Sequence, residues 1–165
     1  MIYTFFGHRD APDNLLIHLE RLLLDLINDD PCPFFYIGTH GNFDAMALDA
    51  VRKLQRDEPK IKYAVVLSRL PGKNAAYPLY SSSETLLPDG IEQTPPRFAI
   101  SYRNQWMLKR ANVVITYVRH PFGNAFRMDR AARSRGKQAI NLANAYSSIP
   151  SSAQATETIG ESDLN

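Results

Sequence analysis

The sequence contains a single cysteine, Cys32, among its 165 residues. One cysteine excludes a disulfide within the chain and argues against a metal cluster built on thiolates. Long hydrophobic runs are also missing, since no apolar stretch reaches the length that crosses a bilayer. The first residues lack the basic start and cleavage pattern of a signal peptide and have the composition of a strand. We therefore expect a cytoplasmic protein with no membrane partner.

Familiar motifs for phosphate binding and nucleophilic catalysis are absent as well. The first predicted strand is not followed by Gly-x-Gly-x-x-Gly, which argues against the dinucleotide fingerprint. Neither a Gly-Lys-Ser/Thr phosphate loop nor a Gly-x-Ser-x-Gly elbow occurs. The histidines His8, His40 and His120 do not have the spacing of a metal site on a helix. We expect no metal and no resident cofactor.

Acidic residues are scarce in one part of the chain. Residues 97–137 contain ten Lys or Arg and one acid, Asp129, whereas residues 1–96 contain nine Lys or Arg and thirteen acids. Such a basic segment suggests phosphate or nucleic acid as a partner, or a solvated helix face opposite an acidic neighbour. Both interpretations stay open at this point.

Apolar residues follow strand-like and helix-like patterns in alternation along most of the chain. Strands are predicted at 2–6, 33–37, 62–67, 112–117 and 138–142, and helices at 12–28, 43–57, 97–110 and 124–135. Strands that alternate with helices indicate a parallel sheet. We therefore predict one α/β, Rossmann-like domain over 1–145, with a five-stranded, mostly parallel sheet and helices on both faces. Residues 146–165 are expected to form a disordered tail.

Two segments carry more specific expectations. Residues 68–96 have no regular period and contain five prolines, which suggests a functional loop or lid, an insertion, or a cover for a sheet edge. In the following helix, Phe98, Tyr102 and Trp106 recur at intervals of four residues. They are predicted to form its buried stripe.

Polar residues gather where the predicted strands end. Three of the four strand ends that lead into a helix carry both glycine and histidine: Gly7 with His8, Gly38 and Gly41 with His40, and Gly123 with His120. Ligands of parallel sheets bind beyond these ends, where the strand order reverses. After the first strand, a turn at Gly7 and a helix capped by Asp10 would form a cradle for an anionic group.

Three stretches resemble one known group of proteins. They are residues 5–9 (Phe-Phe-Gly-His-Arg), residues 38–47 (Gly-Thr-His-Gly-Asn-Phe-Asp-Ala-Met-Ala) and residues 100–107 (Ile-Ser-Tyr-Arg-Asn-Gln-Trp-Met). They resemble short bacterial proteins of the SLOG superfamily, which includes the LOG phosphoribohydrolases, DNA-processing proteins and nucleotide-sensing domains. The resemblance covers about residues 1–143 and implies a Rossmann-like fold with a nucleotide-type ligand at the switch point.

The same resemblance implies a possible reaction. LOG enzymes release the base from a nucleoside 5′-monophosphate with a glycine-rich loop, a glutamate and an Arg-Lys pair. Here Pro121 and Gly123 match that loop, Asp129 stands at the position of the glutamate, and Arg103 stands at the position of the arginine. In a hydrolase Asp129 would activate water or stabilise the ribose cation, and Arg103 would hold the phosphate or leaving group. The competing interpretation of Asp129 is a helix-surface acid paired with Arg133.

Three functions are therefore open. The leading one is a sensor or binding domain for a nucleotide or a nucleotide-derived small molecule; the alternatives are a nucleoside monophosphate phosphoribohydrolase and a nucleic-acid or protein-interaction module that uses residues 97–137. A homodimer is expected by analogy with LOG relatives. The residues expected to contact the ligand are Gly7, His8, Arg9, Gly38, Thr39, His40, Gly41, Asp44, Arg119, His120, Gly123 and Asn124.

Overall fold

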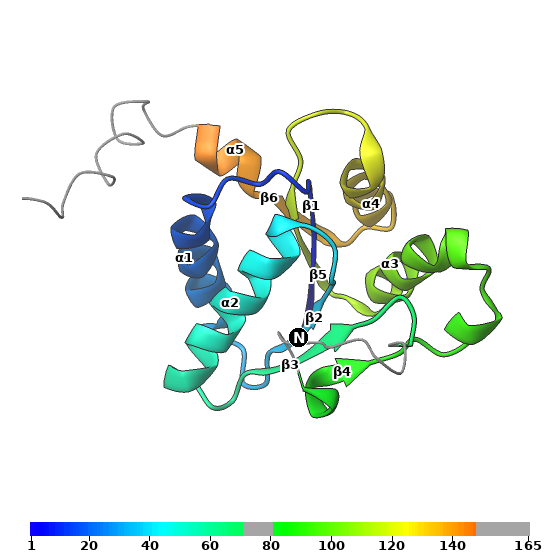
Figure 1. Ribbon diagram of the computed structural model, residues 1–165. Helices are drawn as coiled ribbons and strands as arrows, with labels where there is room; N and C mark the ends of the chain where they lie inside the picture. Colours follow the sequence, from blue (N-terminus) through cyan, green and yellow to red (C-terminus); the bar gives the residue numbers. More distant parts are fainter. Residues whose placement is uncertain (71–80, 148–165) are drawn as a thin grey trace, which may run out of the picture.

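The computed structural model describes residues 1–70 and 81–147 as an α/β fold with one parallel sheet flanked by helices (Figure 1). Within these residues the strands are β1 (Ile2–Gly7), β2 (Phe34–Ile37), β3 (Lys62–Val66), β4 (Thr85–Leu86), β5 (Val113–Tyr117) and β6 (Gln138–Asn141). Their order across the sheet is β4-β3-β2-β1-β5-β6, and every neighbouring pair is parallel.

The sheet has six strands in the described residues, so the prediction of five was wrong. The additional strand, β4, lies in the segment 68–96 and consists of two residues, which is too short to show a period of two. It pairs with the edge of β3, where Val65 lies beside Thr85 and Val66 beside Leu86. Three short 3₁₀ turns also occur in this part of the chain, at Ser82–Glu84, Ile91–Gln93 and Pro96–Phe98.

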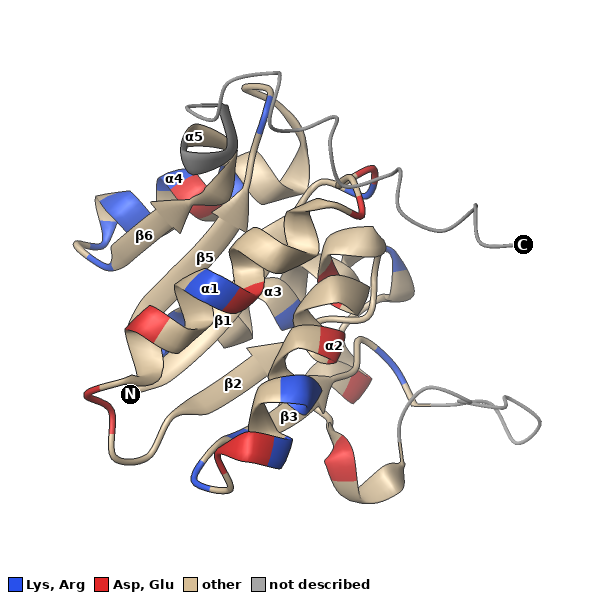
Figure 2. Ribbon diagram, turned by 90° about the vertical axis from the view of Figure 1, so that its left-hand side faces the viewer, with Lys and Arg blue, Asp and Glu red and all other residues tan. Residues whose placement is uncertain are grey.

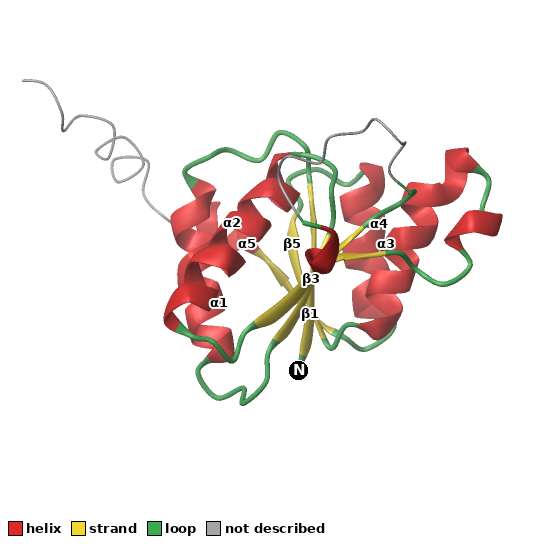
Figure 3. Cartoon of the chain, turned by 60° about the horizontal axis from the view of Figure 1, so that its bottom comes forward, coloured by secondary structure: helices red, strands yellow, loops and turns green. Residues whose placement is uncertain are grey.

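Helices cover both faces of the sheet, as predicted (Figure 3). The helices α1 (Leu15–Ile27), α2 (Asn42–Asp57) and α5 (Leu142–Ser147) pack on one face, and α3 (Ala99–Arg110) and α4 (Gly123–Ser134) pack on the other. Side chains of β1 alternate accordingly, because Tyr3 and Phe5 enter the first core and Phe6 enters the second. No helix among the described residues is both long and apolar enough to cross a membrane.

The first helix starts later than the sequence suggested. Its first residue is Leu15 and its N-cap position is Asn14, so Asp10 does not cap it. The turn after Gly7 therefore does not lead directly into a helix N-terminus, and the predicted cradle is not formed by α1.

The predicted buried stripe of α3 was wrong at two of its three positions, and only Trp106 packs against the second core. Phe98 is 49% exposed and Tyr102 is 37% exposed, whereas Arg103 and Asn104 are each only 3% exposed. Two nitrogens of Arg103 donate to Asn104 Oδ1, and these hydrogen bonds help to make the burial of both side chains tolerable. The Tyr102 hydroxyl instead donates to the carbonyl of Asp89, 2.6 Å away in the connecting segment. At the other end of the chain, α5 continues to Ser147, and the rest of the predicted tail lies outside the described residues.

Candidate functional site

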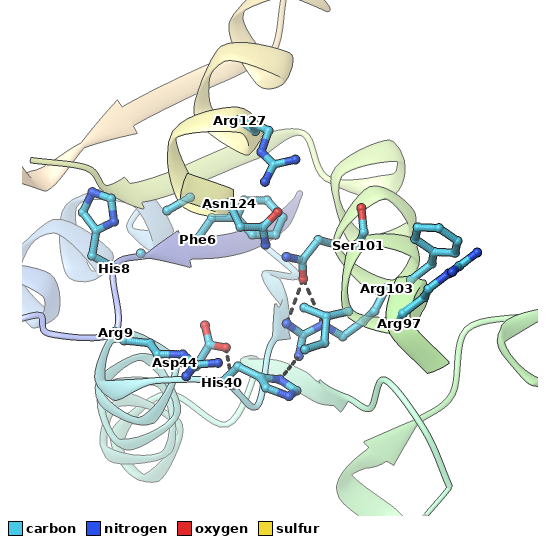
Figure 4. A pocket seen from close by; sticks show the side chains of 15 residues that line it. Phe6, His8, Arg9, His40, Asp44, Arg97, Ser101, Arg103, Asn124 and Arg127 are labelled. Atoms are coloured by element: carbon cyan, nitrogen blue, oxygen red, sulfur yellow. Dashed lines mark hydrogen bonds between the residues drawn. The ribbon is translucent and has the colours of Figure 1, made fainter. Parts of the chain in front are cut away.

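A cavity of about 650 Å³ opens at the carboxyl ends of the strands, between α2, α3 and the start of α4 (Figure 4). From β1 the chain proceeds outward through β2, β3 and β4 and then returns to β5 on the other side of β1. The strand order reverses there, and such a reversal is where open α/β sheets bind ligands. The volume lies within the range of about 300–1,000 Å³ that is typical of small-molecule sites.

Seven residues predicted from the sequence line the cavity: Gly7, His8, Arg9, His40, Asp44, Arg103 and Asn124. Seven others do not line it: Gly38, Thr39, Gly41, Arg119, His120, Gly123 and Asp129. The cavity also has polar lining residues that were not predicted: Arg97, Ser101, Asn104 and Arg127. Their spacing could have indicated that they share one face of a helix. Residues 97, 101 and 104 are four and three residues apart, and Arg127 follows Asn124 by three residues.

Arg103 is the buried cation at the base of the cavity. Its Nε and one terminal nitrogen both donate to Asn104 Oδ1, at 2.9 and 2.8 Å. The other terminal nitrogen, Nη1, lies 3.2 Å from Thr39 Oγ1 and 3.2 Å from His40 Nδ1. The guanidinium is thus fixed between α3 and the loop that follows β2.

His40 is held as a neutral imidazole. Burial and the positive charges of Arg103, Arg9 and Arg69 lower the pKa of His40 to about 4. A guanidinium can only donate, so His40 Nδ1 accepts the hydrogen bond from Arg103. The ring proton consequently lies on Nε2, which makes that nitrogen a hydrogen-bond donor.

Asp44 is the acidic residue of the cavity and lies in the first turn of α2. Its Oδ2 accepts the backbone N–H of His40 at 2.8 Å. Burial raises the pKa of Asp44, while the charge of Arg103 and the hydrogen bond from His40 oppose that rise. Gly38 leaves room for this arrangement, because a Cβ there would lie 2.3 Å from Asp44 Oδ2 and 3.1 Å from Arg103 Nη1.

The loop after β1 packs against the start of α2 and so positions Arg9. Gly41 has a φ of 101° and approaches Arg9 so closely that an added Cβ would lie 2.9 Å from the Arg9 Cα. The backbone N–H of Asn42 donates to the carbonyl of Arg9 at 3.1 Å. These contacts explain why Gly41 belongs to the site without lining the cavity.

Two of the helix N-termini at the cavity, those of α2 and α4, differ in charge. Asp44 occupies the first turn of α2 and neutralises its positive end. The first turn of α4 contains no acid, and its N-cap residue, Phe122, makes no side-chain capping bond. Asn124 and Ala125 of that turn line the cavity. The start of α4 therefore faces the cavity with an uncompensated positive end.

The charge of the cavity is strongly positive overall. Four arginines line it, Arg9, Arg97, Arg103 and Arg127, against the single carboxylate of Asp44. Figure 4 shows Arg9, Arg103 and Arg127 around the same space, each from a different element, with Arg97 at the outer edge. Arg97 also lies over the ring of Phe98, 4.7 Å from its centre. This arrangement can hold a group with one or more negative charges.

A stack of rings borders the cavity at the end of β1. His8 and His120 stack with ring centres 4.2 Å apart, and Phe122 stacks on His120 at 4.7 Å. Nε2 of His8 is buried without a hydrogen-bond partner. Burial, then the neighbouring His120, lowers the pKa of His8, and Arg119 acts in the same direction. Although His120 and Arg119 do not line the cavity, they therefore affect a residue that does.

Asp129 is engaged within the protein. Its Oδ1 accepts the hydroxyl of Thr116 at 2.9 Å, and its Oδ2 accepts Nε of Arg133 at 2.8 Å. The predicted pairing with Arg133 is therefore present. Asp129 is also buried, at 8% exposure, on the face of α4 that packs against β5. In the described residues, no three His, Cys, Asp or Glu side chains are grouped to hold a metal ion.

Comparison with known proteins does not assign the chain to a family. No family model matches the chain, and no curated protein sequence matches it.

Proposed function

We propose that this chain binds a nucleotide or a nucleotide-derived small molecule at the carboxyl ends of its strands. The observation that carries the proposal is the cavity at the reversal of strand order, with four arginines and one carboxylate in its wall. Arg9, Arg103, Arg127 and the start of α4 would receive the phosphate of the ligand. The Rossmann-like arrangement of strands and helices supports the same location.

The resemblance to the SLOG superfamily supports this choice of ligand. The resemblance is carried by residues 5–9, 38–47 and 100–107. These stretches contribute the lining residues Phe6 to Arg9, His40, Asp44, Ile100, Ser101, Arg103 and Asn104. Stretches far apart in the sequence thus supply one cavity. We regard the domain as a sensor or binding module, because Asp129, the residue assigned to water activation in a hydrolase, is not among the lining residues.

The proposal is tested by isothermal titration calorimetry and thermal unfolding with AMP, cyclic nucleotides, NAD and ADP-ribose. A ligand at about 100 times its Kd should stabilise the fold by roughly 2.7 kcal/mol, or several degrees in Tm. Arg127→Gln should weaken binding by about tenfold, because it removes a charge-assisted contact to phosphate.

Arg130→Gln is the matched control. Arg130 is on the same helix as Arg127 and is exposed, but it does not line the cavity. It should leave the Kd of the ligand unchanged. The proposal fails if no nucleotide binds the unaltered protein, or if the two variants lose affinity equally, since equal losses would indicate general attraction to positive charge.

A further inference from the structure

A second cavity, of about 440 Å³, lies beside the first. His40 and Ile100 line both cavities, so the two share a wall at the end of β2 and the start of α3. Its remaining walls come from residues 68–70, which follow β3, and from residues 91–99, which lead into the first residue of α3. Its size alone is sufficient for a small organic group.

The chemistry of the second cavity differs from that of the first. Leu70, Ile91, Pro96, Ala99 and Ile100 give it a mostly apolar wall. The first cavity has four arginines in its lining, whereas the second has one, Arg69. A second anionic group would find few partners here, whereas a flat apolar ring would displace water from apolar surface.

Polar groups are present at a few positions of this apolar wall. Ser68 and Thr94 contribute hydroxyl groups and Glu92 contributes a carboxylate. Such oxygens can accept the ring N–H and amino groups of a heterocycle. A mostly apolar wall with a small number of polar groups is the usual composition of a site for a ring system.

His40 occupies the junction between the cavities. Its Nδ1 accepts a hydrogen bond from Arg103, so its donor is Nε2–H. A ligand that extends from one cavity into the other passes this side chain. A neutral donor at that point suits the uncharged oxygens that connect a phosphate to a base.

We propose that the second cavity receives the heterocyclic base of a nucleotide whose phosphate lies among the arginines of the first cavity. This inference rests on the proposed function and extends it, because it assigns the two ends of the ligand to two separate cavities. It also specifies the ligand class: a phosphate joined to a base by a linker long enough to pass His40.

Calorimetry with AMP and with ribose 5-phosphate tests the assignment, because the two ligands share the phosphate and the sugar and differ in the base. AMP should bind about tenfold more tightly or better, which corresponds to burial of the apolar faces of one base. In Ala99→Leu the added carbons enter the second cavity. This variant should bring the affinity for AMP to within about threefold of that for ribose 5-phosphate, whose own Kd should not change.

Two further variants keep the test decisive. Thr94→Leu adds carbons at another position of the same cavity wall. It replaces Ala99→Leu if that variant unfolds, since Thr94 is half-buried whereas Ala99 is buried. Ala45→Leu, on an exposed position of α2 outside both cavities, is the matched control and should behave as the unaltered protein.

The outcomes separate the two proposals. Equal affinity for AMP and ribose 5-phosphate, or a preference for AMP that survives both filling variants, overturns the assignment of the base and leaves the anion site intact. Absence of binding for both ligands overturns the anion site and the base site together.

Discussion

Arg103 links α3 to the loop after β2 in the candidate site. It is 3% exposed and contacts Asn104, Thr39 and His40. A buried cation needs such partners, since an isolated charge in the interior is strongly unfavourable. The contacts that make the burial of Arg103 tolerable also orient the His40 ring. They therefore determine where the Nε2–H donor of His40 lies at the cavity.

At the residue scale, His40 gives the stability of the protein a defined pH dependence. Its pKa is about 4 in the folded protein, below the ordinary value of 6.5, so the unfolded chain binds this proton first. The free energy of unfolding should therefore fall as the pH falls from about 6.5 to about 4. Urea unfolding at several pH values should show a shallower fall in His40→Gln, whose side-chain oxygen can still accept from Arg103.

His8 keeps part of the pH dependence in that variant, because burial and His120 lower its pKa as well. The two curves should therefore differ in slope without the variant becoming independent of pH. Parallel curves for the two proteins would contradict the neutral state assigned to His40.

At the scale of elements, β4 depends on a small polar network. Glu84, directly before β4, accepts hydrogen bonds from the Tyr63 hydroxyl of β3 and from Arg52 of α2. The hydrogen bond from Tyr63, followed by that from the Ser81 backbone, lowers the pKa of Glu84 to about 2. Glu84 therefore stays ionised over the ordinary pH range, and its contacts attach the segment 81–86 to the edge of the sheet.

Glu84→Gln should loosen this edge without unfolding the domain. It weakens partly exposed, charge-assisted contacts, so the expected loss is about 1 kcal/mol. Amide hydrogen exchange should accelerate at Leu67, whose N–H donates to the carbonyl of Leu86. Glu20→Gln, which removes an ion pair to Lys53 between α1 and α2, is the control and should leave Leu67 unchanged. Unchanged exchange in both variants would contradict the role given to Glu84.

Most helices and strands could be predicted from the sequence, because their hydrophobic residues recur with a clear period and their ends are clearly marked. The parallel sheet and the helices on both faces follow from that alternation. β4 could not be predicted, since two residues have no period and the pairing depends on Glu84 and Tyr63, which are distant in sequence. The prediction for the buried face of α3 was wrong because Arg103 and Asn104 are buried there. Arg103 donates two hydrogen bonds to Asn104, which makes their burial tolerable, and a hydrophobic pattern cannot show this.

For the candidate site, the sequence predicted polar residues at the edge of the sheet where the cavity lies. Gly7, His8 and His40 were expected there because they follow strands, and all three line the cavity. Arg97 and Arg127 were missed as individual residues, since a basic helix is commonly a solvated face and only the tertiary arrangement turns these arginines toward one space.

At the scale of the whole molecule, at least half of the ten Lys and Arg side chains of the basic segment 97–137 line the cavity or contact other side chains of the protein. Arg97, Arg103 and Arg127 line the cavity, Arg133 pairs with Asp129, and Arg110 lies 3.7 Å from the centre of the Trp106 ring. Figure 2 shows positive residues near α4 and β6 and both signs on α1 and α2. The segment thus divides its charge between the cavity and contacts within the protein.

This division predicts weak binding to nucleic acid. A protein that neutralises six to ten phosphates loses about 10³–10⁵ in affinity between 50 and 200 mM salt. We expect a nucleotide to lose only a few-fold over that range, and a labelled single-stranded 20-mer to show no saturable binding by fluorescence anisotropy at 200 mM salt. A steep salt dependence with the 20-mer would instead favour the nucleic-acid module.

The two cavities are built largely from different stretches of the chain. The first takes Arg9 from the loop after β1, Arg103 from α3 and Arg127 from α4, and only Arg97 from the connection that leads into α3. The second is bounded mainly by that connection from β3 to α3. Insertions and substitutions in that connection can reshape the second cavity while Arg9, Arg127 and the start of α4 stay in place. In evolutionary terms, the residues that would hold the phosphate can be conserved while the residues of the second cavity vary. Sequence changes in one surface connection could therefore alter which ligand binds.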